Sequence, residues 1–399
     1  MRAVLAVLIG KLLRFAVRLL RPGGGSSFPG SVANQIHPNL LRDSLQKLPM
    51  GLIVVSGSAG KSSTTHYLVS LLEAHDIKVF TNKSTANIRR GLVGAVLKEI
   101  SISGRLDFDI AVLEWDEGHG AKLADELEVS LAVLTNVLSD QLDRFNDPDD
   151  VIAMLGTIGS NAKRVVLNSD DKNLTQLDCA KAATGFSLGE EADGPDALSY
   201  ALNFGAAGQV KSSVIASREK IQVQSLDLVF DCPDMPAYQR INLAGAVAAL
   251  YEVIDPEQSK VQQVLSDLKP VFARNEQVVV KGISISLRLV QNPSSFQLNL
   301  GDLRSSNSPL MLMAGSDIHD PSWLWTVDFT SLKTVEIVGG KNAASLALRL
   351  LFAGVEVKMV EADPLRAADE FLKLGGSGHT VLFSADAMRR VRRHWGLAK

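Results

Sequence analysis

Short apolar runs alternate with helix-length segments along the first half of the chain. After Gly51 the runs occupy positions 52–55, 78–80, 110–113, 131–134 and 164–167. Buried strands that alternate with helices are typical of βαβ units, in which a parallel sheet is covered by helices on both faces. The pattern therefore predicts an α/β fold with a central parallel sheet.

The rhythm changes after Cys179 and resumes after Arg274. Short β-type runs mixed with glycine and polar residues predict a small antiparallel insertion at about 180–235. Beyond Arg274, strands and helices alternate again, which predicts a second, Rossmann-like domain. We expect an N-terminal helix and linker at 1–45, a central domain at 46–270 and a C-terminal α/β domain at 271–399.

The first twenty residues are apolar apart from a few basic ones. Positions 11, 14, 18 and 21 are basic and fall on one stripe of a helix. The uninterrupted apolar run, 3–10, is much shorter than the ~20 residues that a membrane-spanning helix needs. We expect an amphipathic helix that either lies on a membrane surface or packs on its own domain.

Charge and cysteine content exclude several classes of function. The chain has 41 Lys and Arg against 44 Asp and Glu, a net charge of −3, whereas nucleic-acid-binding proteins usually carry a basic excess. Its two cysteines, Cys179 and Cys232, are too few for a disulfide framework or a four-thiolate zinc site. We therefore predict no nucleic acid, no zinc and a cytoplasmic location, with peripheral attachment to the inner face of the plasma membrane if the first helix binds lipid.

The strongest motif is Gly57-Ser58-Ala59-Gly60-Lys61-Ser62, which joins the first predicted strand to a helix. Backbone N–H groups in such a loop bind phosphate oxygens, the lysine reaches the terminal phosphates, and the serine hydroxyl can hold Mg²⁺. The glycines are closer together than in the common P-loop. We predict an ATP and Mg²⁺ site formed by Gly57, Ser58, Gly60, Lys61, Ser62 and Ser63.

Polar residues also follow the third and fourth predicted strands, whose carboxyl ends open onto the same crevice. Glu114 ends the third strand and is the predicted carboxylate ligand of Mg²⁺. Asp116 and Glu117 either line this site or cap the next helix. The polar segment 135–144 follows the fourth strand, and within it Asn136 is predicted to contact the nucleotide.

These motifs together resemble the Mur ligase family. The resemblance also draws on the segment 167–171 and on Asn242, which opens a helix of small residues. Two motifs of the second domain, at 291–293 and 320–323, resemble the MurT-type branch in particular. The resemblance implies ATP-dependent amidation of the D-glutamate α-carboxylate in the lipid II stem peptide through an acyl phosphate, in peptidoglycan biosynthesis. It also implies that Lys61 and Arg274 stabilise the transferring phosphoryl group and that Asn242 contacts the base.

The resemblance further implies a heterodimer with a glutaminase of the GatD type. Neither cysteine lies in a nucleophile motif, so the ammonia has to come from such a partner. In MurT-type chains an aspartate before a Ser-Trp pair completes the partner's catalytic arrangement, and here that residue is Asp320. The alternative is that Asp320 caps the helix that begins at Pro321.

Several positions depart from the family pattern. Ala59, Gly245 and Ala273 replace residues that are usually polar or, at 273, glycine, and the four-cysteine zinc ribbon of many MurT-type chains is missing. Two other functions therefore stay open: an amino-acid ligase of the Mur and folylpolyglutamate group, or a non-catalytic Mur-like scaffold that binds nucleotide.

Overall fold

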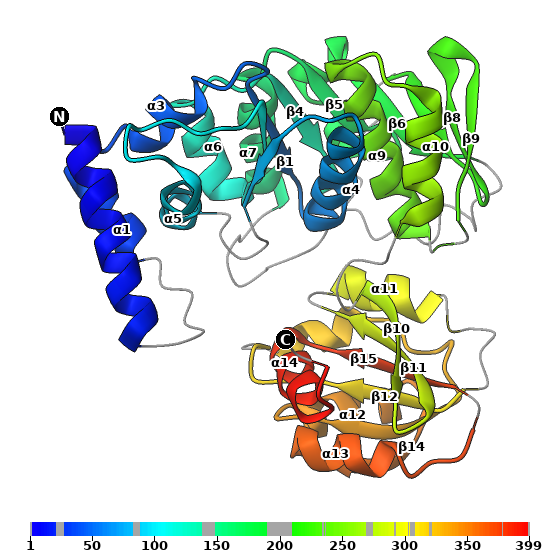
Figure 1. Ribbon diagram of the computed structural model, residues 1–399. Helices are drawn as coiled ribbons and strands as arrows, with labels where there is room; N and C mark the ends of the chain where they lie inside the picture. Colours follow the sequence, from blue (N-terminus) through cyan, green and yellow to red (C-terminus); the bar gives the residue numbers. More distant parts are fainter. Residues whose placement is uncertain are drawn as a thin grey trace. The chain divides into compact units, whose positions relative to one another are not determined.

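The computed structural model of the protein describes residues 2–20, 28–82, 88–137, 148–189, 210–233, 235, 237–268, 274–290, 293–301, 303, 308–318, 321–376 and 378–397. These residues form two compact units, one that extends to Leu268 and one that begins at Arg274 (Figure 1). Each unit contains its own β-sheet.

The first unit is built on a nine-stranded sheet with the order β2-β3-β1-β4-β5-β6-β7-β8-β9. Its strands are β1 (Leu52–Ser56), β2 (Val79–Thr81), β3 (Ile110–Glu114), β4 (Leu131–Leu134), β5 (Val165–Asn168), β6 (Thr184–Leu188), β7 (Ser212–Ala216), β8 (Lys220–Val223) and β9 (Leu228–Asp231). Pairing is parallel from β2 through β7, and β7, β8 and β9 pair antiparallel. Strand β1 is buried along its whole length between β3 and β4.

Helices cover both faces of this sheet. The described α-helices of the unit are α1 (Arg2–Leu20), α2 (Phe28–Ile36), α3 (Leu40–Leu45), α4 (Lys61–Ala74), α5 (Arg89–Glu99), α6 (Glu117–Ala124), α7 (Pro148–Ser160), α8 (Lys172–Thr175), α9 (Ala237–Val253) and α10 (Gln258–Asp267). Right-handed crossovers place α4 on one face and α5, α6 and α7 on the other. Helices α9 and α10 lie beside α4 (Figure 1).

The second unit has a six-stranded sheet with the order β10-β11-β15-β12-β13-β14. Its elements are β10 (Arg274–Val280), β11 (Ile283–Leu289), α11 (Pro293–Gly301), β12 (Leu310–Met313), η4 (Pro321–Thr326), β13 (Thr334–Gly339), α12 (Ala343–Phe352), β14 (Glu356–Glu361), α13 (Pro364–Phe371), β15 (His379–Phe383) and α14 (Ala385–His394). Strands β10 and β11 form an antiparallel hairpin, and the other pairs are parallel.

The predicted α/β fold with a central parallel sheet and a second Rossmann-like unit is confirmed. The antiparallel strands predicted within 180–235 are β7, β8 and β9, and they extend the edge of the central sheet. Helix α1 packs on α2 and α5, so the N-terminal segment contributes to the core of the first unit. Among the described helices, none combines the length and the apolarity required to cross a bilayer.

Candidate nucleotide-binding site

The loop between β1 and α4 has a backbone shape that requires glycine at both ends. Gly57 has φ +134° and Gly60 has φ +85°, a region that residues with a side chain rarely adopt. A Cβ atom on Gly57 would lie 2.2 Å from Oγ1 of Thr135, and one on Gly60 would lie 2.2 Å from Oδ1 of Asn242. The loop is therefore packed closely between the end of β4 and α9.

Two residues that follow β4 hold this loop in place. Ser58 N–H donates to the backbone oxygen of Asn136 (2.9 Å), and Ala59 N–H donates to its side-chain Oδ1 (2.8 Å). In return, Asn136 Nδ2 donates to Ala59 O at 3.1 Å, and Thr135 Oγ1 donates to the same oxygen at 2.6 Å. Asn136 thus fixes the shape of the phosphate loop, which is a positioning contact within the predicted site.

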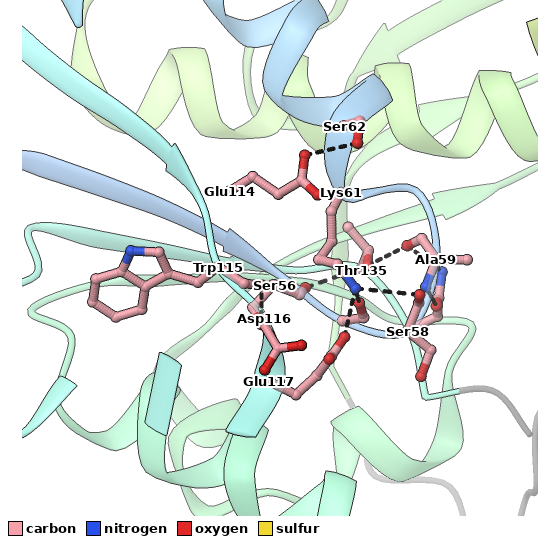
Figure 2. A network of polar contacts seen from close by, with 12 residues as sticks. Ser56, Ser58, Ala59, Lys61, Ser62, Glu114, Trp115, Asp116, Glu117 and Thr135 are labelled. Atoms are coloured by element: carbon pink, nitrogen blue, oxygen red, sulfur yellow. Dashed lines mark hydrogen bonds and ion pairs between the residues drawn. The ribbon is translucent and has the colours of Figure 1, made fainter. Parts of the chain in front are cut away.

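Lys61 begins α4 and is folded back over the loop (Figure 2). Its ammonium group donates to the backbone oxygens of Gly57 and Ser58 and forms an ion pair with Oε1 of Glu117 at 2.6 Å. Only 12% of the Lys61 side chain and 3% of the Glu117 side chain is exposed. The Lys61 ammonium group therefore lies in a polar, largely buried position next to the loop. The N–H groups in the first turn of α4 also favour an anion at this place.

Ser62 and Glu114 bring two hard oxygen donors together. Ser62 Oγ donates to Glu114 Oε2 at 2.7 Å, although the two residues are 52 positions apart in the sequence. The backbone of Glu114 is held in turn by Asn82, which follows β2: Glu114 N–H donates to Asn82 Oδ1 (2.9 Å), and Asn82 Nδ2 donates to Glu114 O (3.0 Å). A hydroxyl and a carboxylate beside a phosphate loop are the ligands that Mg²⁺ prefers, so this donor set fits that ion.

The two acidic residues after Glu114 have separate roles. Asp116 is the N-cap of α6, and its side chain accepts a hydrogen bond from His119 N–H at 3.1 Å. Glu117 instead points at Lys61 (Figure 2). Asp116 therefore caps the helix, whereas Glu117 contacts the lysine of the predicted phosphate loop.

Asn242 lies on α9, is 5% exposed and contacts the loop at Gly60. Gly245 lies about one turn later on the same helix. A Cβ on Gly245 would lie 2.9–3.2 Å from ring atoms of Phe186, a buried residue of β6. The aromatic ring occupies the space of a side chain at position 245, so any larger residue there would require the ring to move.

The remaining predicted residues divide between described and undescribed parts of the chain. Ser58 lies in the loop, and Ser63 is 1% exposed within α4. Arg274 begins β10 in the second unit, but its side chain lies outside the described part of the structure, as does Asp320. Most of the segment 135–144 is also undescribed, so that the structure places only residues 135–137 of it.

Asp171 connects β5 to the segment that follows β4. Its Oδ2 accepts from Val137 N–H at 2.7 Å, and its Oδ1 accepts from Asn173 and Leu174 N–H at the start of α8. Burial raises the pKa of Asp171 to about 6, although the three hydrogen bonds act in the opposite direction. Asp171 therefore keeps the carboxyl end of β4, and with it the phosphate-loop contacts, in place.

Two residues of the site were missed or left open from the sequence. Asn82 directly follows β2, just as Glu114 ends β3 and Asn136 comes shortly after β4, so the same signal of a polar residue at a strand end would have found it. Glu117 lies 56 positions from Lys61, and nothing in the local pattern indicates that the two side chains meet.

Two family models and several curated relatives match this chain. Residues 55–250 match the Mur ligase middle domain, and residues 289–382 match the MurT ligase C-terminal domain. The lipid II isoglutaminyl synthase (glutamine-hydrolyzing) subunit MurT of Staphylococcus aureus strain COL is 24% identical over 94% of both chains. The corresponding subunit of Streptococcus pneumoniae strain R6 is 26% identical over 90% of this chain and 89% of its own.

Solved structures share the fold at low sequence identity. The MurF ligase of Thermotoga maritima in complex with ADP aligns over 94% of this chain and 84% of its own, with a TM-score of 0.66 and 18% identity. E. coli FolC in complex with DHPP and ADP aligns over 89% of this chain and 91% of its own, with a TM-score of 0.61 and 16% identity. With the two domain models matched in order and relatives aligned along nearly the whole chain, this protein belongs to the Mur ligase family and resembles its MurT members.

Proposed function

We propose that this chain is the synthetase subunit of a complex that amidates lipid II. It would convert the α-carboxylate of D-glutamate in the stem peptide to the amide of D-isoglutamine, with ATP as the energy source. Membership in the Mur ligase family supports the coarser assignment, a peptidoglycan-related ATP-dependent ligase. The observation that carries the finer assignment is the match to the MurT ligase C-terminal domain, in the same chain as this phosphate loop.

The reaction would proceed in two steps. An oxygen of the substrate carboxylate attacks the γ-phosphorus of ATP, a new O–P bond forms, and ADP leaves. Ammonia then attacks the acyl carbon with its lone pair, inorganic phosphate leaves, and the nitrogen loses a proton to give the amide. The protein's task in both steps is to position the reactants and to neutralise charge.

Lys61 and the Ser62–Glu114 pair would carry the first step. The Lys61 ammonium group, now paired with Glu117 at the start of α4, would exchange that partner for the β- and γ-phosphates of ATP. The Ser62 hydroxyl and the Glu114 carboxylate would hold Mg²⁺, which supplies positive charge beside the transferred phosphoryl group. Arg274 would add a further positive charge, and Asn242 would contact the nucleotide.

The ammonia would come from a glutaminase subunit of the GatD type. Burial raises the pKa of the Cys179 thiol, opposite to what a nucleophilic thiolate requires, and Cys232 is buried. Asp320 would complete the partner's Cys–His arrangement, acting as the carboxylate does in a catalytic triad. The substrate is lipid-linked, so that the complex would work at the inner surface of the plasma membrane.

Product analysis tests the proposal. The purified chain is incubated with lipid II, ATP, Mg²⁺ and heavy-nitrogen ammonium, or with glutamine and a GatD-type glutaminase, and the stem peptide is examined by mass spectrometry. We expect the heavy nitrogen in an amide at D-glutamate. A product that instead contains an added amino acid would favour the amino-acid ligase, and ATP binding without any product would favour the scaffold.

Two variants connect the activity to the site. Lys61→Ala should lower amidation by about a thousandfold or more, because it removes the charge that meets the phosphates. Lys98→Ala, at the exposed end of α5, is the matched control and should leave the rate unchanged. Wild-type turnover in Lys61→Ala would contradict the assignment of the phosphate site.

A further inference from the structure

Helix α1 is fixed to the first unit by one of its faces. Ala6, Val7 and Gly10 are buried against α2 and α5. The contact is close, since a Cβ on Gly10 would lie 2.8 Å from Cδ1 of Leu97 and 3.3 Å from Cβ of Ala33. This packing makes α1 a part of the folded protein, so the helix packs on its own domain, which is one of the two alternatives that the sequence left open.

The opposite face of α1 is apolar and exposed. Leu5, Leu8, Leu12 and Phe15 have exposed fractions of 51%, 38%, 68% and 70%. They recur at spacings of three and four residues, so they form one stripe along the helix, here called the outer stripe. A helix that is apolar on two opposite faces needs a cover for the second face, and exposed apolar surface of this kind marks an interaction site.

The charge of the N-terminal segment specifies the kind of cover. Residues 1–42 contain six Lys and Arg and no acidic residue, a charge of +6, whereas the rest of the chain carries −9. Within α1, helical geometry places Arg2 along one border of the outer stripe and Lys11 along the other. An apolar stripe bordered by basic residues is complementary to a surface with an apolar interior and anionic head groups.

We propose that α1 lies in the plane of an anionic lipid bilayer and inserts the outer stripe into the boundary between head groups and acyl chains. The packed face keeps the helix against the first unit, so the helix binds parallel to the surface, with its basic borders at the lipid phosphates. A second copy of the chain fits this face less well, because two helices with basic charge and no acidic residue repel each other. The proposal does not depend on the amidation reaction.

Co-sedimentation of the full chain with vesicles tests this proposal. One set of vesicles contains phosphatidylcholine alone, and the other contains phosphatidylcholine and phosphatidylglycerol in a two-to-one ratio. We expect binding to the anionic vesicles that is at least about tenfold stronger and that weakens with added salt. The double variant Leu12→Gln/Phe15→Gln keeps good helix formers on the surface of α1 and should reduce this binding by about tenfold or more.

A matched double variant controls for a general loss of apolar surface. Leu351 and Phe352 are 60% and 72% exposed in the second unit, so Leu351→Gln/Phe352→Gln removes similar groups elsewhere and should bind vesicles as the wild type does. Thermal unfolding and ATP binding of both variants verify their fold independently of lipid. Absence of vesicle binding, equal binding by wild type and the α1 variant, or an equal loss in the control would each overturn the proposal. A concentration-dependent dimer that Leu12→Gln/Phe15→Gln dissociates, without any lipid binding, would assign the stripe to a second copy instead.

Discussion

The ion pair between Lys61 and Glu117 offers the sharpest test of how the site works, because ATP should replace one of its members. Glu117→Gln removes the negative charge but keeps an oxygen that can accept a hydrogen bond from Lys61. At 2.6 Å and an effective dielectric constant of about 20, the lost attraction is about 6 kcal/mol. Part of this loss is offset, because the neutral amide avoids the several kcal/mol that desolvation of the carboxylate costs.

The net expectation is a loss of about 3 kcal/mol in the free energy of unfolding when no nucleotide is present. For a unit of this size the loss corresponds to a fall in Tm of about 5–10 °C. Bound ATP supplies phosphate charge to Lys61, so most of the deficit should vanish with saturating ATP and Mg²⁺. The ATP-induced rise in Tm should therefore be larger in Glu117→Gln than in the wild type.

Thermal unfolding with and without nucleotide measures both quantities. Asp107→Asn is the matched control: it breaks the exposed ion pair with Lys78, and it should cost less than about 1 kcal/mol with no dependence on ATP. If Glu117→Gln lost the same stability with and without ATP, Lys61 would not exchange Glu117 for phosphate. If it lost none, the pair would not contribute to the folded state.

Three further predictions concern the loop, its support and the partner. Gly60→Ala should lower the free energy of unfolding by about 1–3 kcal/mol and weaken ATP binding, because φ is +85° at this position and the new Cβ collides with Asn242. Urea unfolding measures the first effect and calorimetry the second. Gly94→Ala is the control and should not destabilise the protein, because a Cβ at Gly94 meets only open space. The raised pKa of Asp171, about 6, means that the folded protein holds this proton more tightly than the unfolded chain. Its contribution to stability should therefore fall by about 3 kcal/mol in total as the pH rises from about 3, below the unfolded pKa, to about 7, above the folded pKa, and Asp171→Asn should flatten that part of a urea-derived stability profile. Asp320→Asn should abolish glutamine-driven amidation and retain ammonium-driven turnover, whereas a helix cap would tolerate asparagine and leave both rates unchanged.

The parts of the site that the sequence predicted are those encoded locally. A buried strand, a loop with two glycines and a helix that begins with Lys61 follow one another along the chain, so periodicity and turn chemistry suffice to place them. The position of Glu114 in the site could also be predicted from the sequence, because the carboxyl ends of parallel strands meet at one edge of a sheet.

The parts that escaped prediction depend on tertiary contacts. The ion pair between Glu117 and Lys61 joins residues 56 positions apart, and the hydrogen bond between Asn82 and Glu114 joins residues 32 positions apart. Periodicity carries no information about such partners. The same limit applies to β7–β9, which the sequence predicted only as an antiparallel insertion. The alternation of residues shows that strands are present, but it does not show which edge of which sheet they join.

The central claim is that the phosphate site activates a carboxylate as an acyl phosphate and that ammonia then replaces the phosphate. Lipid II labelled with heavy oxygen in the α-carboxylate of D-glutamate tests this most directly, with ATP, Mg²⁺ and ammonium as the other reactants. The account predicts that one labelled oxygen per turnover appears in the released inorganic phosphate and that Lys61→Ala abolishes this transfer. Amide product accompanied by unlabelled phosphate would contradict the account, because the carboxylate oxygen would then never have been bonded to phosphorus.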